Sequence, residues 1–352
     1  MQQYNAGEYH ASYRSFEELS QLGNSQVSAH LGIMILGAEG TDYDPVKAWA
    51  YFELAGEQGY SDGHAFAQEV YDQLTTEQQT STAQALDELK ANLIVNHEYD
   101  LPDEARAADL VPLERPAVNY PRRSAERRRL GFANTRFLID TDGSVSTIDT
   151  HFYSHRDFKI ATERAIQSWR YEPVAVPAAT TVSINFTIAG RAQQDLVPYF
   201  EFIHESLWES AMAGNPSSQA TLGFVLRAIS NHSDEREIDE ERVSSDPPTF
   251  EEFQAPENLA AFPVNWTGKY WLTLAAQAGD YSAQGSLAFS DPQWRDYLLG
   301  KKDEPTMAWE AVRLLQREDG HEQGRALIAQ LEDSESNVVQ NILRTIKPYY
   351  QQ

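Results

Sequence analysis

The clearest pattern of hydrophobic and polar positions lies in the block 118–190. Apolar and polar residues alternate through 131–139 and again through 181–188, and a period of two is typical of a half-buried strand. After the first of these segments, the turn Asp140-Thr-Asp-Gly143 predicts a hairpin that returns through 145–152, because glycine accepts a positive φ. Apolar residues at helical spacing follow the hairpin. The predicted order is therefore strand, strand, helix, strand.

Alternation also assigns each strand residue to one face of the sheet. The residues predicted to face the covering helix are Ala133, Thr135, Phe137 and Ile139 in the first strand, and Val182, Ile184, Phe186 and Ile188 in the last. A capped start at Ser154 and Asp157 is predicted for the helix, and Trp169 is predicted on its buried side. Pro173 ends any continuation of that helix.

Several motifs follow one another through this block in a fixed order. They are the pair Tyr120-Pro121, Gly131 at the start of the first strand, Asp142-Gly143 followed by Val145, Ala165 and Trp169 in the helix, Tyr171 with Pro173, and the closing strand that ends at Gly190. In this order and spacing they resemble the C-terminal domain of the TonB energy-transducer family. The resemblance implies a periplasmic domain whose last strand accepts an extended peptide from an outer-membrane transporter. It also implies that the domain transmits motion generated by an inner-membrane proton-driven motor.

The segment that precedes this block contains an internal repeat, which runs from Tyr4 to about Leu74. The repeated positions are Phe16, Gly23 and Ala29, which recur at one constant offset as Phe52, Gly59 and Ala65. The pattern resembles Sel-like repeats, which are related to tetratricopeptide arrays and form one helical hairpin per repeat. A scaffold is the expected role of this array, and a groove that binds peptides is the alternative.

The same small-residue and glycine pattern returns after Gly190. Copies lie at 211–223 and 271–283, with a weaker copy at 309–327. Between the first two copies, 230–266 is rich in Asp, Glu and Pro and is expected to be a mobile insertion.

The predicted fold class is α+β, with a small TonB-like β-β-α-β domain between two α-helical repeat (α-solenoid) segments. The expected domains are Sel-like helical repeats with a capping helix at 1–96, a proline-containing linker at 97–117, the TonB C-terminal-like domain at 118–190, and helical repeats with the acidic insertion at 191–352.

The charge of the chain limits its partners. Lys and Arg total 28 against 53 for Asp and Glu, and the resulting net charge of -25 argues against nucleic acid and against anionic lipid surfaces. The longest apolar run, Leu31–Ala38, is far shorter than the roughly 20 residues that span a bilayer. TonB-type transducers carry an N-terminal anchor and a proline-rich spacer. We therefore expect membrane attachment only through an anchor outside this sequence. On this expectation, the sequence begins after a removed leader or anchor.

Sequence motifs of catalytic and cofactor sites are missing. The chain has no phosphate loop, no dinucleotide fingerprint and no Gly-x-Ser-x-Gly motif, and it has no cysteine for disulfides or thiolate metal sites. His151 and His155 are spaced for a metal pair on a helix, but strand and turn are predicted there. We therefore expect no enzymatic activity, no cofactor and no metal site.

Basic residues are concentrated at the start of the block. The candidate contact patch consists of Tyr120, Arg122, Arg123, Arg127 and Arg128. Such a patch is suited to peptidoglycan or to an acidic partner surface. The alternative is that these arginines pair with the acidic residues of the flanking repeats.

Two functions remain open. In the first, the chain is a periplasmic TonB-family protein that binds periplasmic segments of an outer-membrane TonB-dependent transporter by strand addition, with inner-membrane motor proteins as further partners. The strand expected to bind is Thr181, Val182, Ser183, Ile184, Asn185, Phe186, Thr187 and Ile188, with selectivity from Ser183, Asn185 and Thr187 on an open face. In the second, it is a periplasmic scaffold that uses the same modules without energy coupling.

Overall fold

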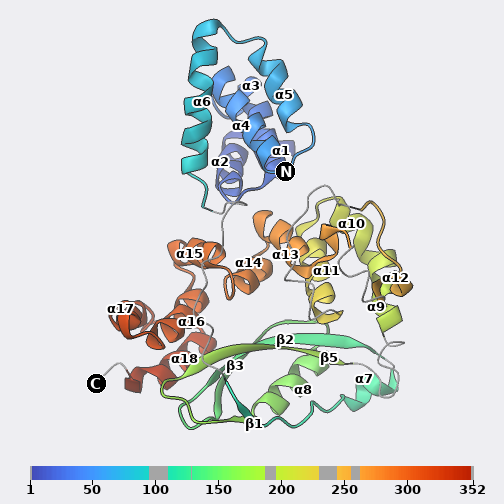
Figure 1. The fold of residues 1–352 in the computed structure, drawn as a ribbon, viewed down its shortest axis with the longest axis vertical. Helices are drawn as coiled ribbons and strands as arrows, with labels where there is room; N and C mark the ends of the chain where they lie inside the picture. The colour runs from blue at the N-terminus through green and yellow to red at the C-terminus, as the bar shows by residue number, and fades with distance from the viewer. Residues whose placement is uncertain are drawn as a thin grey trace. The chain divides into compact units, whose positions relative to one another are not determined.

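The computed structural model describes residues 2–94, 110–127, 129–186, 196–229, 244–254 and 262–349. The chain divides into two compact units (Figure 1). The first contains Met1–Leu101 with Gln277–Asp280, and the second contains Pro102–Ala276 with Tyr281–Gln352.

The described part of the first unit is built from helices. They are α1 (Gln2–Asn5), α2 (Tyr9–Ser20), α3 (Ser25–Leu36), α4 (Pro45–Glu57), α5 (Gly63–Tyr71) and α6 (Thr76–Ala91). Aromatic residues such as Phe16 and Phe52 join Leu31, Met34 and Val70 in one buried cluster. The capping helix expected at the end of the segment 1–96 is α6, which begins at Thr76 and ends at Ala91.

The predicted repeat has a counterpart in the backbone. Gly23 and Gly59 lie between the two helices of successive hairpins, with φ of +78° and +90°. Gly214 and Gly279 occupy the same place between later helices, with φ of +84° and +92°. Only glycine adopts this conformation without strain, so the recurring glycines set the same turn in each hairpin. The Sel-like assignment and the solenoid arrangement stay predictions.

The second unit contains the strands and the remaining helices. The strands are β1 (Pro112–Glu114), β2 (Gly131–Ile139), β3 (Val145–Tyr153), β4 (Arg170–Tyr171) and β5 (Ala178–Phe186). The helices are α7 (Arg122–Glu126), α8 (Arg156–Ile166), α9 (Val197–Phe202), α10 (Trp208–Met212), α11 (Pro216–Ile229), α12 (Phe250–Gln254), α13 (Gly268–Gln277), α14 (Tyr281–Leu287), α15 (Pro292–Gly300), α16 (Glu304–Leu315), α17 (His321–Gln330) and α18 (Asn337–Ile346).

The predicted order of strand, strand, helix, strand is confirmed by β2, β3, α8 and β5. These strands form an antiparallel sheet in the order β3-β2-β5, and β1 pairs with β4 beside it. The predicted apolar face packs beneath α8. Phe137 and Ile139 cluster with Ile166 and Trp169, and Phe186 stacks on Phe158 with ring centroids 4.3 Å apart.

The hairpin turn follows the prediction, and the helix cap does not. Gly143 has φ +83°, and its N–H donates to the carbonyl of Asp140 at 2.9 Å. A Cβ on Gly143 would lie 2.0 Å from the carbonyl oxygen of Tyr171, so glycine is required there. The N-cap of α8 is His155, whose ring accepts from an N–H of the first turn. The predicted cap Ser154 instead bonds with the backbone of β2.

The second face of the sheet is also covered. Figure 1 shows α8 on one side of the sheet and α11 with α14 and α16 on the other. Leu138 of β2 is fully buried in a cluster with Trp309 and Val312 of α16 and Ile342 of α18. The sheet and the C-terminal helices therefore share one hydrophobic core.

Part of the predicted insertion is folded. Trp266 is 2% exposed and stacks on Trp208 with ring centroids 5.1 Å apart, and α12 lies within the same segment. Trp266, within the segment expected to be a mobile insertion, is thus packed against the helical part of the chain, because its ring supplies apolar area that the acidic stretch lacks. Residues 230–243 and 255–261 lie outside the described residues, as do 95–109 of the predicted linker.

Candidate functional site: the outer edge of β5 and the adjoining cavity

The hydrogen bonds of β2 show which of its backbone groups face β5. The carbonyl of Phe132 accepts from the N–H of Ser154 at 3.0 Å, and the N–H of Asp140 donates to Ser144 at 2.8 Å. Both of these bonds are made on the β3 side. Successive residues of a strand point their backbone groups to opposite edges. The odd-numbered residues 131–139 therefore bond to β5.

The register carries this alternation across to β5. Thr135 lies opposite Val182, so the backbone of Val182 bonds to β2. Its neighbours Thr181 and Ser183, and by the same alternation Asn185, direct their N–H and C=O groups away from the sheet. Among the described residues, no strand pairs along this outer edge. The sequence left open which groups point outward, and the register now assigns them.

Side chains beside this edge are partly engaged. Thr181, Ser183 and Asn185 are exposed. The hydroxyl of Ser183 donates to Asn134 Oδ1, and the amide of Asn185 donates to the carbonyl of Ala228 near the end of α11. The face of the sheet beside these residues was expected to be open. Helices of the C-terminal part cover it there, so this expectation is corrected. Thr187 and Ile188 lie outside the described residues.

The candidate basic patch lies away from the β5 edge. Arg122, Arg123 and Arg127 are exposed, and Arg122 pairs with Glu126 at 2.9 Å. The ring of Tyr120 packs inward, edge-on to Phe158 and Phe186. The patch is thus formed by the arginines of α7, which border a groove of about 770 Å³ along α8. Arg128 lies outside the described residues.

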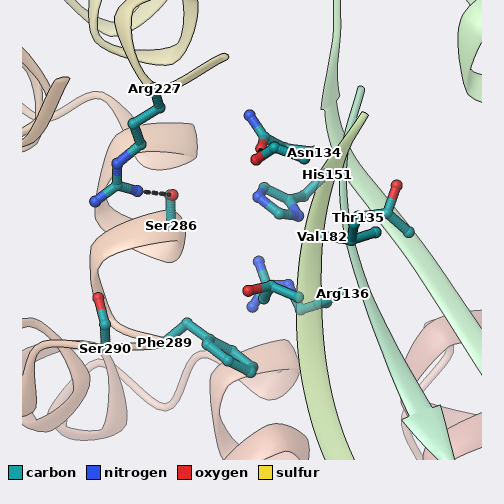
Figure 2. A pocket seen from close by; sticks show the side chains of 11 residues that line it. Asn134, Thr135, Arg136, His151, Val182, Arg227, Ser286, Phe289 and Ser290 are labelled. Carbon is teal, nitrogen blue, oxygen red and sulfur yellow. Dashed lines mark hydrogen bonds between the residues drawn. The ribbon is translucent and has the colours of Figure 1, made fainter. Parts of the chain in front are cut away.

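A cavity of about 310 Å³ lies between the sheet and the helices that cover it. Figure 2 shows Asn134, Arg136 and His151 extending from the sheet. Arg227 and Ser286 lie on the helices opposite, and Phe289 lies in the turn after α14. Thr181 and Ser183 also line the cavity. It therefore adjoins the strand edge described above.

Charge and burial in this cavity are unusual for a sheet surface. Arg136 is 8% exposed, and its Nε lies 3.2 Å from Asp149 Oδ2. Burial lowers the pKa of the Arg136 guanidinium, and the Asp149 carboxylate opposes that effect. Burial and the charge of Arg136 lower the pKa of His151 to about 3, so its ring is neutral at neutral pH.

The cavity residues have a weak signal in the sequence. Arg136 occupies a polar position of an alternating strand. Such a position predicts a solvated side chain unless helices are known to cover that face of the sheet. The β-bulge in β3 adds one residue opposite the Asn134–Thr135 step, which places His151 beside the ladder. A buried guanidinium can therefore be recognised only once α11 and α14 are known to lie over the strand.

The block can now be compared with known proteins. The family model described as Gram-negative bacterial TonB protein C-terminal matches residues 116–188. This block is therefore similar to the C-terminal domain of TonB proteins. Among solved structures, the solution NMR structure of the Pseudomonas aeruginosa TonB CTD is similar, with 27% identity and a TM-score of 0.23. That match covers 24% of this chain and 93% of the other. No curated protein matches the chain.

The motifs that resemble the TonB C-terminal domain have structural roles in this chain. Gly131 packs so closely against Phe158 that a Cβ would lie 2.1 Å from the ring. Trp169 fills the core beneath β2, and Tyr171 joins the same cluster. These motifs therefore hold α8 against the sheet. Within the described part of the chain, no helix has the length and apolar character needed to cross a bilayer.

Proposed function

We propose that this chain is a periplasmic TonB-family protein that binds the periplasmic segment of an outer-membrane TonB-dependent transporter by strand addition to β5, in support of energy-dependent uptake. The proposal rests on the outer edge of β5, within the block that resembles a TonB C-terminal domain. There, Thr181, Ser183 and Asn185 are exposed and direct backbone groups outward. An extended peptide can pair with such an edge through its main chain, with little demand on its own sequence.

Binding of a transporter peptide tests this proposal. The probe is an extended peptide from the periplasmic N-terminal segment of a TonB-dependent transporter, titrated into the full chain and followed by amide chemical shifts. Ser183→Pro and Asn185→Pro each remove an outward N–H and should weaken binding at least about tenfold, the equivalent of one lost hydrogen bond. Proline is tolerated at a sheet edge, so both variants should stay folded.

The matched controls are Ser183→Ala and Asn185→Ala, which keep the backbone N–H groups and remove only the side chains. We expect them to bind within about threefold of the wild type, since the ladder supplies most of the affinity. Binding that persists unchanged in both folded proline variants rules out strand addition at β5.

A second candidate is a periplasmic scaffold without energy coupling, and one observation favours it. Leu138 of the TonB-like domain is buried with Trp309 and Ile342 of the C-terminal helices, so the domain is part of a larger helical unit. Such a unit is suited to holding protein partners on its helical surface. In the same titration, a transporter peptide that shifts no amide of β5 would favour this candidate. We propose no enzymatic activity for either candidate.

A further inference from the structure

The cavity between the sheet and the C-terminal helices contains buried donors that lack acceptors. Asn134 is 8% exposed, and its Nδ2 has no hydrogen-bond partner, while its Oδ1 is occupied by Ser183. His151 Nδ1 is also buried without a partner, and it is a donor in the neutral tautomer that carries the proton on Nδ1. A buried polar group without a partner is unfavourable, so an acceptor placed between these groups would be stabilised.

Arg136 contributes charge at the same place. Its Nε faces Asp149 in an ion pair whose geometry does not form a hydrogen bond. The guanidinium lies near the ring faces of Phe289 and Trp309, at 5.9 and 5.8 Å from their centroids. These apolar rings exclude water from one side of the guanidinium, which strengthens its attraction for an anion.

The opposite wall adds a second cation. Arg227 Nη1 donates to Ser286 Oγ at 3.1 Å, and both residues line the cavity (Figure 2). The charge of Arg227, like that of Arg136, disfavours protonation of His151. The ring therefore remains a neutral hydrogen-bonding group between two guanidinium groups.

The carboxylates of the site limit the charge of a ligand. Asp149 pairs with Arg136, and Asp303 lies near enough to influence it. Asp303 accepts from the Tyr281 hydroxyl at 2.7 Å and from the N–H of Thr306 at 2.9 Å. Two arginines are thus largely balanced by two carboxylates. A singly charged anion fits this balance better than a dianion, and the two guanidinium groups disfavour a metal cation.

From this arrangement we infer that the cavity binds a carboxylate group, held by Arg136 with Asn134 Nδ2 and His151 Nδ1 as neutral partners. A carboxylate offers two planar oxygens, which match a guanidinium and its neighbouring donors. The volume of about 310 Å³ admits a small acid or one side chain. Thr181 and Ser183 are exposed and line the cavity, so a ligand can enter from the β5 edge.

The test uses the full chain with sodium acetate as the probe and sodium chloride at equal ionic strength as the control. The readouts are the Arg136 Nε–H resonance and the side-chain amide resonances of Asn134, which also report on Arg136→Met. A saturable shift with acetate and none with chloride is expected. Arg136→Met and His151→Phe should each weaken acetate binding, the former at least about tenfold for the lost charge-assisted bond. The same shift with chloride, or a shift that never saturates, overturns the inference.

Arg136→Met removes the ion-pair partner of Asp149, which is a reason for this variant to fail to fold. A blocking variant keeps the test valid in that case. A Cβ on Gly285 of α14 would lie 3.9 Å from Arg136 Nη2, which is ordinary contact. Gly285→Leu should therefore fold, place its side chain against the guanidinium and abolish the acetate shift. Gly285→Ala is the matched control and should bind acetate as the wild type does. Retained binding in folded Gly285→Leu overturns the inference.

A further arm distinguishes a free acid from an acidic side chain, and this arm alone rests on the proposed strand addition. Residues opposite each other on paired strands share a face, so a peptide residue opposite Ser183 would point towards the cavity. A peptide with Asp there should bind more tightly than the Asn version, and Gly285→Leu should remove that difference. Asn185→Pro, at a residue that does not line the cavity, should weaken peptide binding and leave acetate binding intact. Failure of strand addition and failure of the cavity are thereby separated.

Discussion

The indole Nε1 of Trp169 donates a hydrogen bond of 3.1 Å to the carbonyl oxygen of Pro116, which ties the segment before the sheet to the end of α8. The same indole is 3% exposed and packs edge-on against Phe137 of β2, and the guanidinium of Arg115 lies 4.2 Å from its ring centroid. One side chain therefore joins a strand, a helix end and an incoming segment.

Replacing Trp169 by alanine should destabilise the second unit by about 3–5 kcal/mol, since a large buried aromatic leaves a cavity that the sheet cannot close. Urea denaturation followed by circular dichroism measures the loss. Trp169→Phe retains part of the packing, loses the bond to Pro116 and should cost clearly less. A change below about 1 kcal/mol for the alanine variant would mean that the side chain does not support this core.

Gly143→Ala should destabilise the hairpin by at least about 2 kcal/mol, because a residue other than glycine is strained at this φ. The added Cβ would also meet the carbonyl oxygen of Tyr171 at 2.0 Å. Thermal denaturation checks this expectation. Gly300→Ala is the control, since a Cβ there meets nothing within 4 Å and should leave stability unchanged or slightly raised. Equal melting temperatures for the two variants would contradict the turn geometry.

The register of β5 predicts opposite results for two adjacent prolines. Val182→Pro removes an N–H that bonds to β2 and should cost about 3 kcal/mol or more, whereas Ser183→Pro removes an outward N–H and should cost less than about 1 kcal/mol. Chemical denaturation of the two variants gives the comparison. A larger loss for Ser183→Pro would show that the inward and outward sets are reversed.

His151 should make the second unit sensitive to acid. Its pKa is about 3 in the folded chain against an ordinary value of 6.5. Between these values the unfolded chain binds the additional proton, so stability falls as pH falls from about 6.5 towards 3, by up to about 4 kcal/mol. Denaturant titrations at several pH values should give a smaller acid-induced loss for His151→Phe than for the wild type. Parallel pH curves for the two proteins would contradict a buried, neutral ring.

How much the sequence predicts depends on the range of the interaction. Alternation in β2 and β5 and the turn at Gly143 are local, because the period of a strand and a positive φ depend on neighbouring residues. The sequence therefore predicted the sheet, the covering helix and the strand proposed for partner binding. It placed the helix cap at Ser154, since Ser is a common cap, whereas the chain uses Ser154 for the sheet and caps α8 with His155.

The cavity was decided by tertiary structure alone. Arg136 and Ser183 have the alternation of a solvated sheet face, and no local pattern reveals that α11, α14 and α16 cover it. Those helices bring Arg227 and Ser286 to the residues of β2 and β3 from distant parts of the chain. Burial and charge coupling arise only from that packing, because desolvation depends on what surrounds a group rather than on its neighbours in sequence. The sequence by itself thus determined the strands, and the tertiary structure determined which backbone groups of β5 point outward and the charged cavity beside them.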